Sequence, residues 1–312
     1  MTLQVTKTAA AIGGIALDAP IFDPHAFRLD DEQALIIARA RELGQSRFAA
    51  RAAAHDRDAT FPIENYQELH RAGLLGISIP KNHGGLGAGY QTYMLAAAEI
   101  GRYCGATALT WNMHVCSTLW SGPLVDDLDI DAATRAEHER RRAIHYKRIV
   151  SDGAIYAQPF SEGGAAAAGA IAFGTDAKPV KGGWIVNGKK IFASLSGHAD
   201  YYGALCTETV EGEKASRRNT LYLAVPAKAG GVSVVGDWDP LGMRGTVSRH
   251  SSSRTCSWRR RRRLCRAGST SRPPNAGRTC SLRCRRPIWD LRKPHTISPC
   301  DTCAAKRRSR RL

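Results

Sequence analysis

The sequence changes character at Arg249, and this change limits what the chain can fold into. Residues 249–312 contain 20 Lys and Arg but only two Asp, whereas residues 1–248 are nearly neutral, with 25 basic and 26 acidic side chains. The same segment has no Val, Phe, Tyr or Met and only six Leu and Ile. So few large apolar side chains cannot bury a core that offsets the entropy of ordering the chain. We therefore predict a globular body followed by an Arg-rich, disordered tail over residues 249–312.

Three origins of this tail are open. Five consecutive arginines at residues 259–263 suit contacts with nucleic-acid phosphates. A loose zinc pattern is also present, with spacing that departs from the usual paired motif. Its ligands would be Cys280, Cys284, His295, Cys300 and Cys303. The third origin, which we favour, is out-of-frame translation of a GC-rich gene: synonymous codons for residues 250–258, read in another frame, give the strand-like string Leu-Phe-Phe-Lys-Asp-Val-Phe-Val. We therefore expect neither a metal site nor a specific nucleic-acid partner.

The body, residues 1–248, is long enough for one large domain or two small ones. It contains no run of 18 apolar residues, so we predict no membrane span. The weakly apolar stretch at residues 9–17 lacks the flanks of a signal peptide. Three sparse cysteines, Cys104, Cys116 and Cys206, fit a reducing compartment better than a disulfide scaffold. We therefore expect a cytoplasmic protein.

The first half of the body has the spacing of helices. After an extension over residues 1–24, we predict an N-terminal all-α domain over residues 25–150, with helices at 63–72, 90–102 and 106–120. An earlier helix begins at Asp30 or Asp31 and continues to about residue 54. A charged helix at 131–148 is expected to be solvated surface. The glycine-rich residues 84–89 lack the G-x-G-x-x-G spacing, so we expect a flexible loop rather than a phosphate site.

The second half, residues 151–248, has the period of strands. Strands are expected at residues 155–158, 201–206, 221–225 and 232–235. Asn187 and Gly188 predict a tight hairpin, because a primed turn needs positive φ at both positions. Helices followed by antiparallel strands predict an α+β fold in two domains rather than a parallel βαβ sheet.

Four segments together resemble the acyl-CoA dehydrogenase family. They are residues 73–87 (GLLGISIPKNHGGLG), 156–164 (YAQPFSEGG), 184–194 (WIVNGKKIFAS) and 237–246 (DWDPLGMRGT). They occur in family order and with family-like spacing, and the resemblance covers roughly residues 25–248. It implies a helical domain, a central β-domain and a C-terminal four-helix bundle, which is missing where the Arg-rich tail stands. It also implies FAD as cofactor, an acyl-CoA substrate, an electron-transfer acceptor and, with the bundle, a homo-oligomer.

The resemblance also implies which residues bind the cofactor. Tyr156, Gln158 and Ser161 belong to the loop that lies beside the isoalloxazine ring in the family. Phe192 stands where the family commonly has Trp packed against the flavin, and Ser194 where it commonly has Thr near N5. Two residues apart on one strand, Phe192 and Ser194 would share a sheet face. Ordinary core packing is the alternative for Phe192, and a turn role is the alternative for Gln158 and Ser161.

Several other residues of the body are expected to have structural roles. We expect His83, His114 and His198 to be structural or on the surface, Arg244 to make a structural ion pair, and Trp238 and Met243 to contribute to packing. Nothing in the sequence places Glu99, Glu162 or Glu208 beside a substrate, so we do not expect them to act as catalytic bases.

The activity that the resemblance implies is α,β-dehydrogenation of an acyl-CoA thioester, with a hydride passing to the flavin. The family's catalytic carboxylate comes from the C-terminal bundle, and no Glu follows residue 248 here. We therefore assign no catalytic residue and expect the chain as it stands to retain little FAD and to be impaired. Ala157, where the family usually has Thr, keeps open a flavin-dependent monooxygenase of the same fold. A nucleic-acid-binding protein that uses the basic tail is the alternative from another class.

Overall fold

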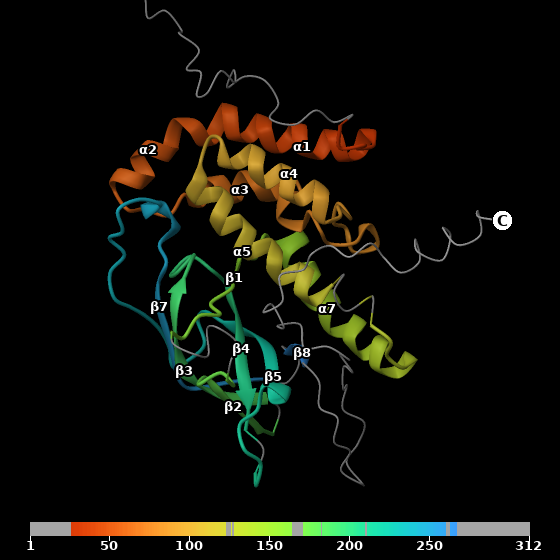
Figure 1. The fold of residues 1–312 in the computed structure, drawn as a ribbon, viewed down its shortest axis with the longest axis vertical. Coiled ribbons are helices and arrows are strands. Elements are labelled where there is room, and N and C mark those ends of the chain that lie inside the picture. The colour runs from red at the N-terminus through yellow and green to blue at the C-terminus, as the bar shows by residue number, and fades with distance from the viewer. Residues whose placement is uncertain are drawn as a thin grey trace, which may run out of the picture.

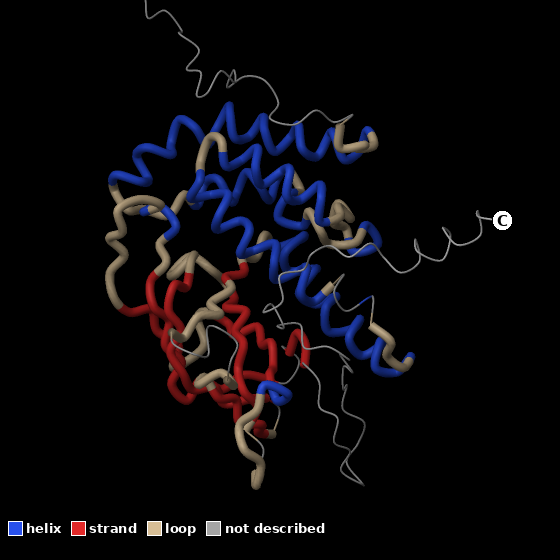
Figure 2. Tube along the Cα trace, viewed as in Figure 1, coloured by secondary structure: helices blue, strands red, loops and turns tan. Residues whose placement is uncertain are grey.

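The computed structural model describes residues 26–122, 126, 128–163, 171–181, 183–209, 211–259 and 263–266. Helices make up one half of the molecule and a curled sheet the other, and α5 and α7 lie along the boundary (Figures 1 and 2). This order confirms the predicted α+β fold with a helical domain before a β-domain. The predicted extension over residues 1–24, the zinc ligands and the place of the bundle lie outside the described residues.

The helical domain follows the predicted pattern closely. Its helices are α1 (Asp31–Leu43), α2 (Ala49–Arg57), α3 (Ile63–Arg71), α4 (Tyr90–Gly101), α5 (Gly105–Ser121) and α7 (Ala132–Asp152). A π-helical turn, Gly44–Phe48, joins α1 to α2, so the long first helix continues past residue 54 as expected. Asp30 caps α1 through a capping box: its carboxylate accepts the Gln33 N–H at 2.8 Å, and the Gln33 side chain accepts the Asp30 N–H.

The glycine-rich loop at residues 84–89 is tied to the preceding turn. The N–H groups of Leu86, Gly87 and Ala88 donate to the backbone carbonyls of residues 76, 79 and 77 at 2.8–3.2 Å. A Cβ on Gly85 would lie 2.1 Å from the carbonyl oxygen of Ile79. The predicted loop is therefore present, but its glycines permit close backbone packing.

The prediction that α7 is solvated is wrong for one of its faces. His138, Arg142, His145, Tyr146 and Ile149 are all buried. These positions recur every three or four residues and form a single stripe along the helix. The stripe is hard to see in the sequence because histidine and arginine occupy positions that apolar residues usually hold.

The sheet has eight strands. They are β1 (Tyr156–Ala157), β2 (Asp176–Val180), β3 (Gly183–Ala193), β4 (Tyr201–Glu208), β5 (Thr220–Pro226), β6 (Val232–Val235), β7 (Arg249–Arg259) and β8 (Arg263–Arg266). The order is β6-β7-β3-β2-β4-β5-β8, and β1 pairs with β4. Most pairs are antiparallel, as predicted, but β1 and β2 both run parallel to β4. β2 and β4 are neighbours that run in the same direction, and each also pairs antiparallel with a strand on its other side, β2 with β3 and β4 with β5.

The predicted hairpin at Asn187 and Gly188 is wrong, because both residues lie inside the single long strand β3. The turn is earlier, since Val180 pairs with Gly183 across residues 181 and 182. β2 and β7 flank β3 on its two sides, so β3 stays extended through the dipeptide. A Cβ on Gly188 would lie only 2.3 Å from Oγ1 of Thr175. Glycine is needed here for close backbone approach at a register irregularity.

The prediction of a disordered tail is wrong for residues 249–259 and 263–266. Residues 249–259 form β7, which pairs antiparallel with both β3 and β6, and β8 pairs with β5. The ladder of a sheet is made by backbone N–H and C=O groups, which every non-proline residue carries. Low apolar content therefore does not prevent these residues from completing the ladder beside β3. Residues 260–262 and 267–312 lie outside the described part of the chain.

Candidate functional site

Two segments far apart in the sequence meet at the end of β3. The loop after β1 is fixed to β3 because the Ile191 N–H donates to the Ser161 carbonyl at 2.8 Å. Directly after this contact, Phe192 is 60% exposed, although it is a large aromatic residue within a strand. Ser161 and Ser194 are both half-buried. The structure therefore brings three of the predicted cofactor residues, Ser161, Phe192 and Ser194, to the C-terminal end of β3, although Ser194 follows the strand and does not lie on it as predicted.

The backbone around the C-terminal end of β3 is strained. Six non-glycine residues have positive φ in the described part of the chain, and four of them lie here. They are Phe192 (53°), Leu195 (65°), Met243 (57°) and Val247 (44°). The left-handed region is uncommon for any residue with a Cβ and costs most for a β-branched one such as Val247. Strain of this kind persists only where the surroundings enforce it, and it concentrates at functional sites.

A second segment, residues 243–248, makes hydrogen bonds with Ser194 and with the two residues that follow it. The Ser194 and Ser248 hydroxyls are 2.8 Å apart, and the Ser248 hydroxyl donates to Oγ1 of Thr246 at 2.9 Å. The backbone N–H groups of Leu195 and Ser196 donate to the carbonyls of Thr246 and Val247, both at 3.1 Å. Thr246 and Ser248 are partners of the site that we did not predict from the sequence. The signal was present, since two hydroxyl residues alternate directly after Gly245.

Tyr156 and Gln158, the other two predicted cofactor residues, point into the interior. The Tyr156 hydroxyl lies 2.7 Å from Nδ1 of His145, and its ring stacks on Tyr201. Burial raises the pKa of Tyr156 well above its usual range. Gln158 is only 7% exposed and donates its side-chain amide to the Tyr222 hydroxyl at 3.2 Å. Both side chains therefore pack in the interior under the loop and are not exposed at the end of β3.

Glu162, in the same loop, is held in a fixed ion pair. Its carboxylate lies 2.6 Å from Nζ of Lys190 and accepts the backbone N–H groups of Gly174 and Thr175 at 2.6 and 2.9 Å. Burial would raise the pKa of Glu162, but Lys190 and the bonds to Thr175 outweigh it and hold the pKa below its ordinary value. A carboxylate kept ionised and fully bonded is a poor proton acceptor. This agrees with the expectation that Glu162 is not a catalytic base.

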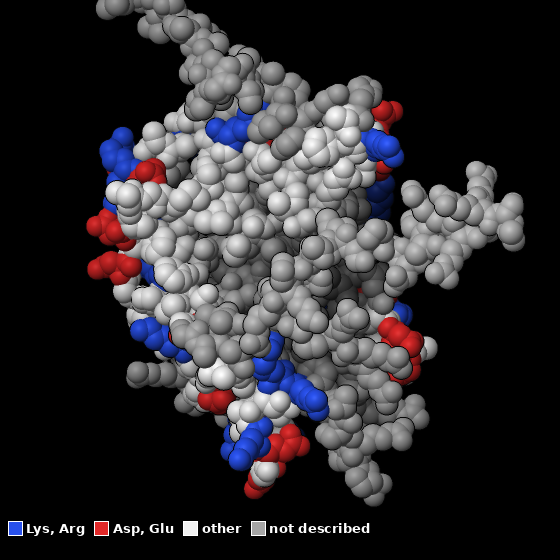
Figure 3. Space-filling view, in the orientation of Figure 1, with Lys and Arg blue, Asp and Glu red and all other residues white. Residues whose placement is uncertain are grey.

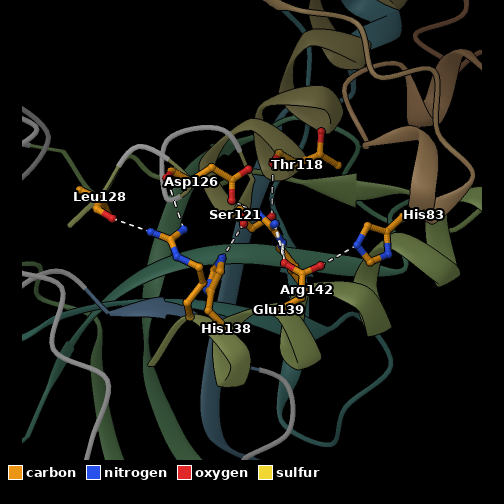
Figure 4. Close-up of polar contacts among 9 residues, drawn as sticks. His83, Thr118, Ser121, Asp126, Leu128, His138, Glu139 and Arg142 are labelled. Atoms are coloured by element: carbon orange, nitrogen blue, oxygen red, sulfur yellow. Dashed lines mark hydrogen bonds and ion pairs between the residues drawn. The ribbon is translucent and has the colours of Figure 1, made fainter. Parts of the chain in front are cut away.

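A second polar cluster lies between α5 and α7 (Figure 4). Arg142 pairs with Asp126 at 2.6 Å and with Glu139 at 2.5 Å, and Glu139 also contacts Nε2 of His83 at 2.6 Å. Nε2 of His138 lies 2.8 Å from the Ser121 carbonyl. Burial opposes the charge on Glu139, yet Arg142 and His83 keep its pKa lowered. We call this group the α7 cluster. Among the described residues its charges lie in ion pairs, and the cluster joins α7 to His83, to Asp126 and to Ser121 at the end of α5.

His114 in the helical domain and His198 in the β-domain make internal contacts. Nε2 of His114 lies 3.1 Å from the Leu75 carbonyl, and its Nδ1 accepts the Tyr156 N–H at 3.0 Å. Burial lowers the pKa of His114 to about 4. His198 stacks on Phe61. Within the described ranges, no group of three or more His, Cys, Asp or Glu could hold a metal ion. Among these same ranges, no helix has both the length and the apolarity to cross a membrane.

The end of β3 at Phe192 combines apolar and polar groups. The exposed Phe192 ring meets the Trp238 ring edge-on, with centroids 6.3 Å apart, and the two form an apolar corner. Ser194 follows Phe192 by two residues, and its N–H donates to the Phe192 carbonyl at 2.9 Å. The loop at residues 161–163, where Gly163 has a φ of +83°, is bonded to Ile191 through the Ser161 carbonyl. We call Ser161, Phe192, Ser194 and Trp238 the ring face. An isoalloxazine ring needs such a combination of aromatic packing and polar contacts along its edge.

Comparison with known proteins agrees with this geometry. The family model for the acyl-CoA dehydrogenase N-terminal domain matches residues 30–123, and the model for the middle domain matches residues 160–254. Probable acyl-CoA dehydrogenase YngJ of Bacillus subtilis is 26% identical over 223 residues, which cover 70% of this chain and 54% of YngJ. L-evernosamine nitrososynthase of Micromonospora is 28% identical and is matched over 64% of this chain and 44% of its own.

A solved structure shows the same fold with a flavin. FMN-bound TdsC from Paenibacillus superposes with a TM-score of 0.62 at 25% identity, covering 74% of this chain and 54% of TdsC. The chain thus spans about half the length of the relatives it matches. Both matched domains, in the order that the sequence predicted, account for more than half of its residues. The chain belongs to the acyl-CoA dehydrogenase family of flavin-dependent oxidoreductases, whose members use FAD, the cofactor that the sequence predicted.

Proposed function

We propose that the ring face holds the flavin of an acyl-CoA dehydrogenase, whose reaction is the α,β-dehydrogenation of an acyl-CoA thioester. The observation that carries this proposal is Phe192, an aromatic side chain 60% exposed on a strained backbone beside a hydroxyl that is fixed from behind. An exposed aromatic ring held at a cost in backbone energy is best explained by a partner ring that covers it.

Each residue of the ring face has a distinct role in this proposal. Phe192 and Trp238 pack against the ring system and exclude water from one side. Ser194, whose hydroxyl is oriented by Ser248, makes a hydrogen bond with the polar edge of the ring. The bound flavin supplies the hydride acceptor. We assign no carboxylate of the described residues as the base. Glu162, in the loop of the site, is held in an ion pair with Lys190.

The substrate half of the proposal is tested by spectroscopy of the flavin-loaded protein. Acyl-CoA thioesters of graded chain length are added without oxygen, and the oxidised-flavin absorption and the enoyl thioester product are followed. Dehydrogenation predicts loss of the oxidised band together with enoyl product. Because no catalytic base is assigned, we expect both changes to be slow. Oxygen transfer by the reduced flavin, with no enoyl product from any thioester, would contradict dehydrogenation. An electron-transfer acceptor, a homo-oligomeric state and a cytoplasmic location belong to the same proposal.

Flavin-dependent monooxygenation is a second candidate, favoured by one specific position. Ala157 is fully buried and offers no hydroxyl where the family usually has Thr. Similarity to FMN-bound TdsC and to a nitrososynthase also supports this candidate. It predicts that reduced flavin on the protein consumes oxygen and transfers an oxygen atom to an added acceptor, while acyl-CoA leaves the oxidised flavin unchanged. The two functions therefore give opposite results in the same pair of assays.

A further inference from the structure

One arginine of the β-domain reaches across to the helical domain and binds a single residue there twice. The backbone N–H of Arg244 donates to Oδ1 of Asp56 at 2.9 Å, and its side-chain Nε donates to the Asp56 carbonyl, also at 2.9 Å. The other side of the guanidinium pairs with Asp239. Asp56 lies in the last turn of α2, 188 residues earlier in the chain. Arg244 therefore joins the two domains through both its backbone and its side chain.

The short 3₁₀ turn that carries this arginine, η5 (Arg244–Thr246), fits closely between two helices. A Cβ added to Gly245 would lie 3.3 Å from the Ala106 Cβ at the start of α5 and 3.4 Å from the Thr60 carbonyl just after α2. In Figure 1 this turn is part of the cyan segment that precedes β7 and lies under α2. The fit leaves little room for η5 to shift relative to the helical domain.

From η5, hydrogen bonds continue without a gap to the ring face. The Thr246 hydroxyl donates to the Met243 carbonyl at 2.8 Å and accepts from the Ser248 hydroxyl at 2.9 Å. Ser248 in turn contacts Ser194 at 2.8 Å. Met243 and Val247, on the two sides of η5, are two of the four strained residues. Strained conformations need surrounding contacts to hold them, and the contacts to Asp56 lie at the far end of this chain of bonds.

We propose that Asp56 is a positioning residue for the flavin: its carboxylate and carbonyl fix Arg244, and through η5 they set the position of the Ser194 hydroxyl on the ring face. This proposal rests on the proposed function of the ring face. A helix of one domain thereby controls the geometry of a site that belongs to the other. Asp56 touches neither the flavin nor a substrate, so it acts only through Arg244.

The test compares three variants of the full chain. Asp56→Ala removes the carboxylate acceptor, and Asp56→Asn keeps an acceptor oxygen at the same place. Asp58→Ala is the matched control, because it removes an exposed pair with Arg57 two residues away that does not reach η5. FAD binding is measured by quenching of flavin fluorescence. Losing the alignment of one hydrogen bond predicts about three- to tenfold weaker FAD binding for Asp56→Ala. We expect values close to those of the unchanged chain for Asp56→Asn and Asp58→Ala.

A second measurement needs no flavin. The amides of Leu195 and Ser196 donate to Thr246 and Val247, so their hydrogen exchange reports whether η5 is in place. We expect faster exchange at both amides in Asp56→Ala and unchanged exchange in Asp58→Ala. Equal exchange in Asp56→Ala and the unchanged chain would overturn the positioning role, even if FAD binds. Faster exchange at these amides with no FAD binding to the unchanged chain would support the positioning contact and refute the ring face.

Discussion

The ring face and the α7 cluster are both groups of polar residues at a junction of elements, yet they are built in opposite ways. In the α7 cluster Arg142 lies between two carboxylates, and the backbone around it is regular helix. In and around the ring face the backbone is strained at Phe192, Leu195, Met243 and Val247, and Phe192 is open to solvent. Paired charges on regular backbone indicate a contact that stabilises the fold. Strain beside an exposed aromatic ring indicates a surface that a ligand completes.

The largest effect that we expect separates these two roles through stability. Arg142→Ala leaves Asp126 and Glu139 without their shared cation, and loss of ion pairs whose arginine is buried costs about 3 kcal/mol of the free energy of unfolding. The value is at the low end for a buried pair because the two carboxylates are 41% and 39% exposed. Chemical denaturation measures it. Arg140→Ala, which removes an exposed pair with Glu137 on the same helix, is the control and should cost less than about 0.5 kcal/mol.

The FAD affinity of Arg142→Ala should equal that of the unchanged chain under conditions in which both are folded. A marked loss of FAD affinity in this variant would show that the α7 cluster shapes the site after all.

The buried His114 gives a pH dependence of stability. Burial lowers the pKa of His114 to about 4 in the folded chain. In the unfolded chain the same side chain binds a proton near pH 6.5. Stability is therefore fully present above about pH 6.5 and falls as the pH falls toward 4, by about 2 kcal/mol between pH 7 and pH 5. Denaturation at a series of pH values measures the slope. His114→Gln, which cannot take up the proton, should flatten it; an unchanged slope would assign the effect to other groups.

Gly188 tests the corrected course of β3. In Gly188→Ala the new Cβ would overlap Thr175, and overpacking of this kind costs about 1–3 kcal/mol. Gly230→Ala is the control, because a Cβ there would meet nothing within 4 Å. Equal unfolding temperatures for the two variants would contradict the close contact between Gly188 and Thr175.

The smallest change in stability is expected at the ring face. Phe192→Gly relieves a positive φ, and this gain nearly offsets the extra entropy of glycine in the unfolded chain, so stability should change by less than about 1 kcal/mol. FAD binding should nevertheless weaken by up to about tenfold, because the aromatic contact is lost. Thermal unfolding and a flavin titration on the same sample test both statements. A large loss of stability with unchanged FAD binding would make Phe192 a core residue.

Local signals in the sequence predicted the helical domain well, because caps and stop residues are local: Asp30 begins α1 and Gly73, with a φ of +76°, ends α3. They failed where a tertiary contact decided the outcome. Asn187 and Gly188 look like a turn, but strands on both sides of β3 keep them extended. The buried stripe of α7 was hidden because Arg142 is buried only through partners that the sequence does not reveal.

The candidate site divides in the same way. The motif positions indicated Ser161, Phe192 and Ser194, which the structure brings together. They could not show that Gln158 turns inward to Tyr222 or that Ser248 holds Ser194, since both contacts join residues more than 50 positions apart.

The most direct test of the ring face is an equilibrium titration of the protein with FAD, FMN and riboflavin, with ADP as a competitor. If binding is through the ring at Phe192 and Ser194, the three flavins should bind with dissociation constants within about threefold of one another. ADP should not displace them, and Phe192→Gly should weaken all three alike. Displacement of FAD by ADP, with no binding of riboflavin, would contradict the assignment and place the cofactor contact elsewhere on the molecule.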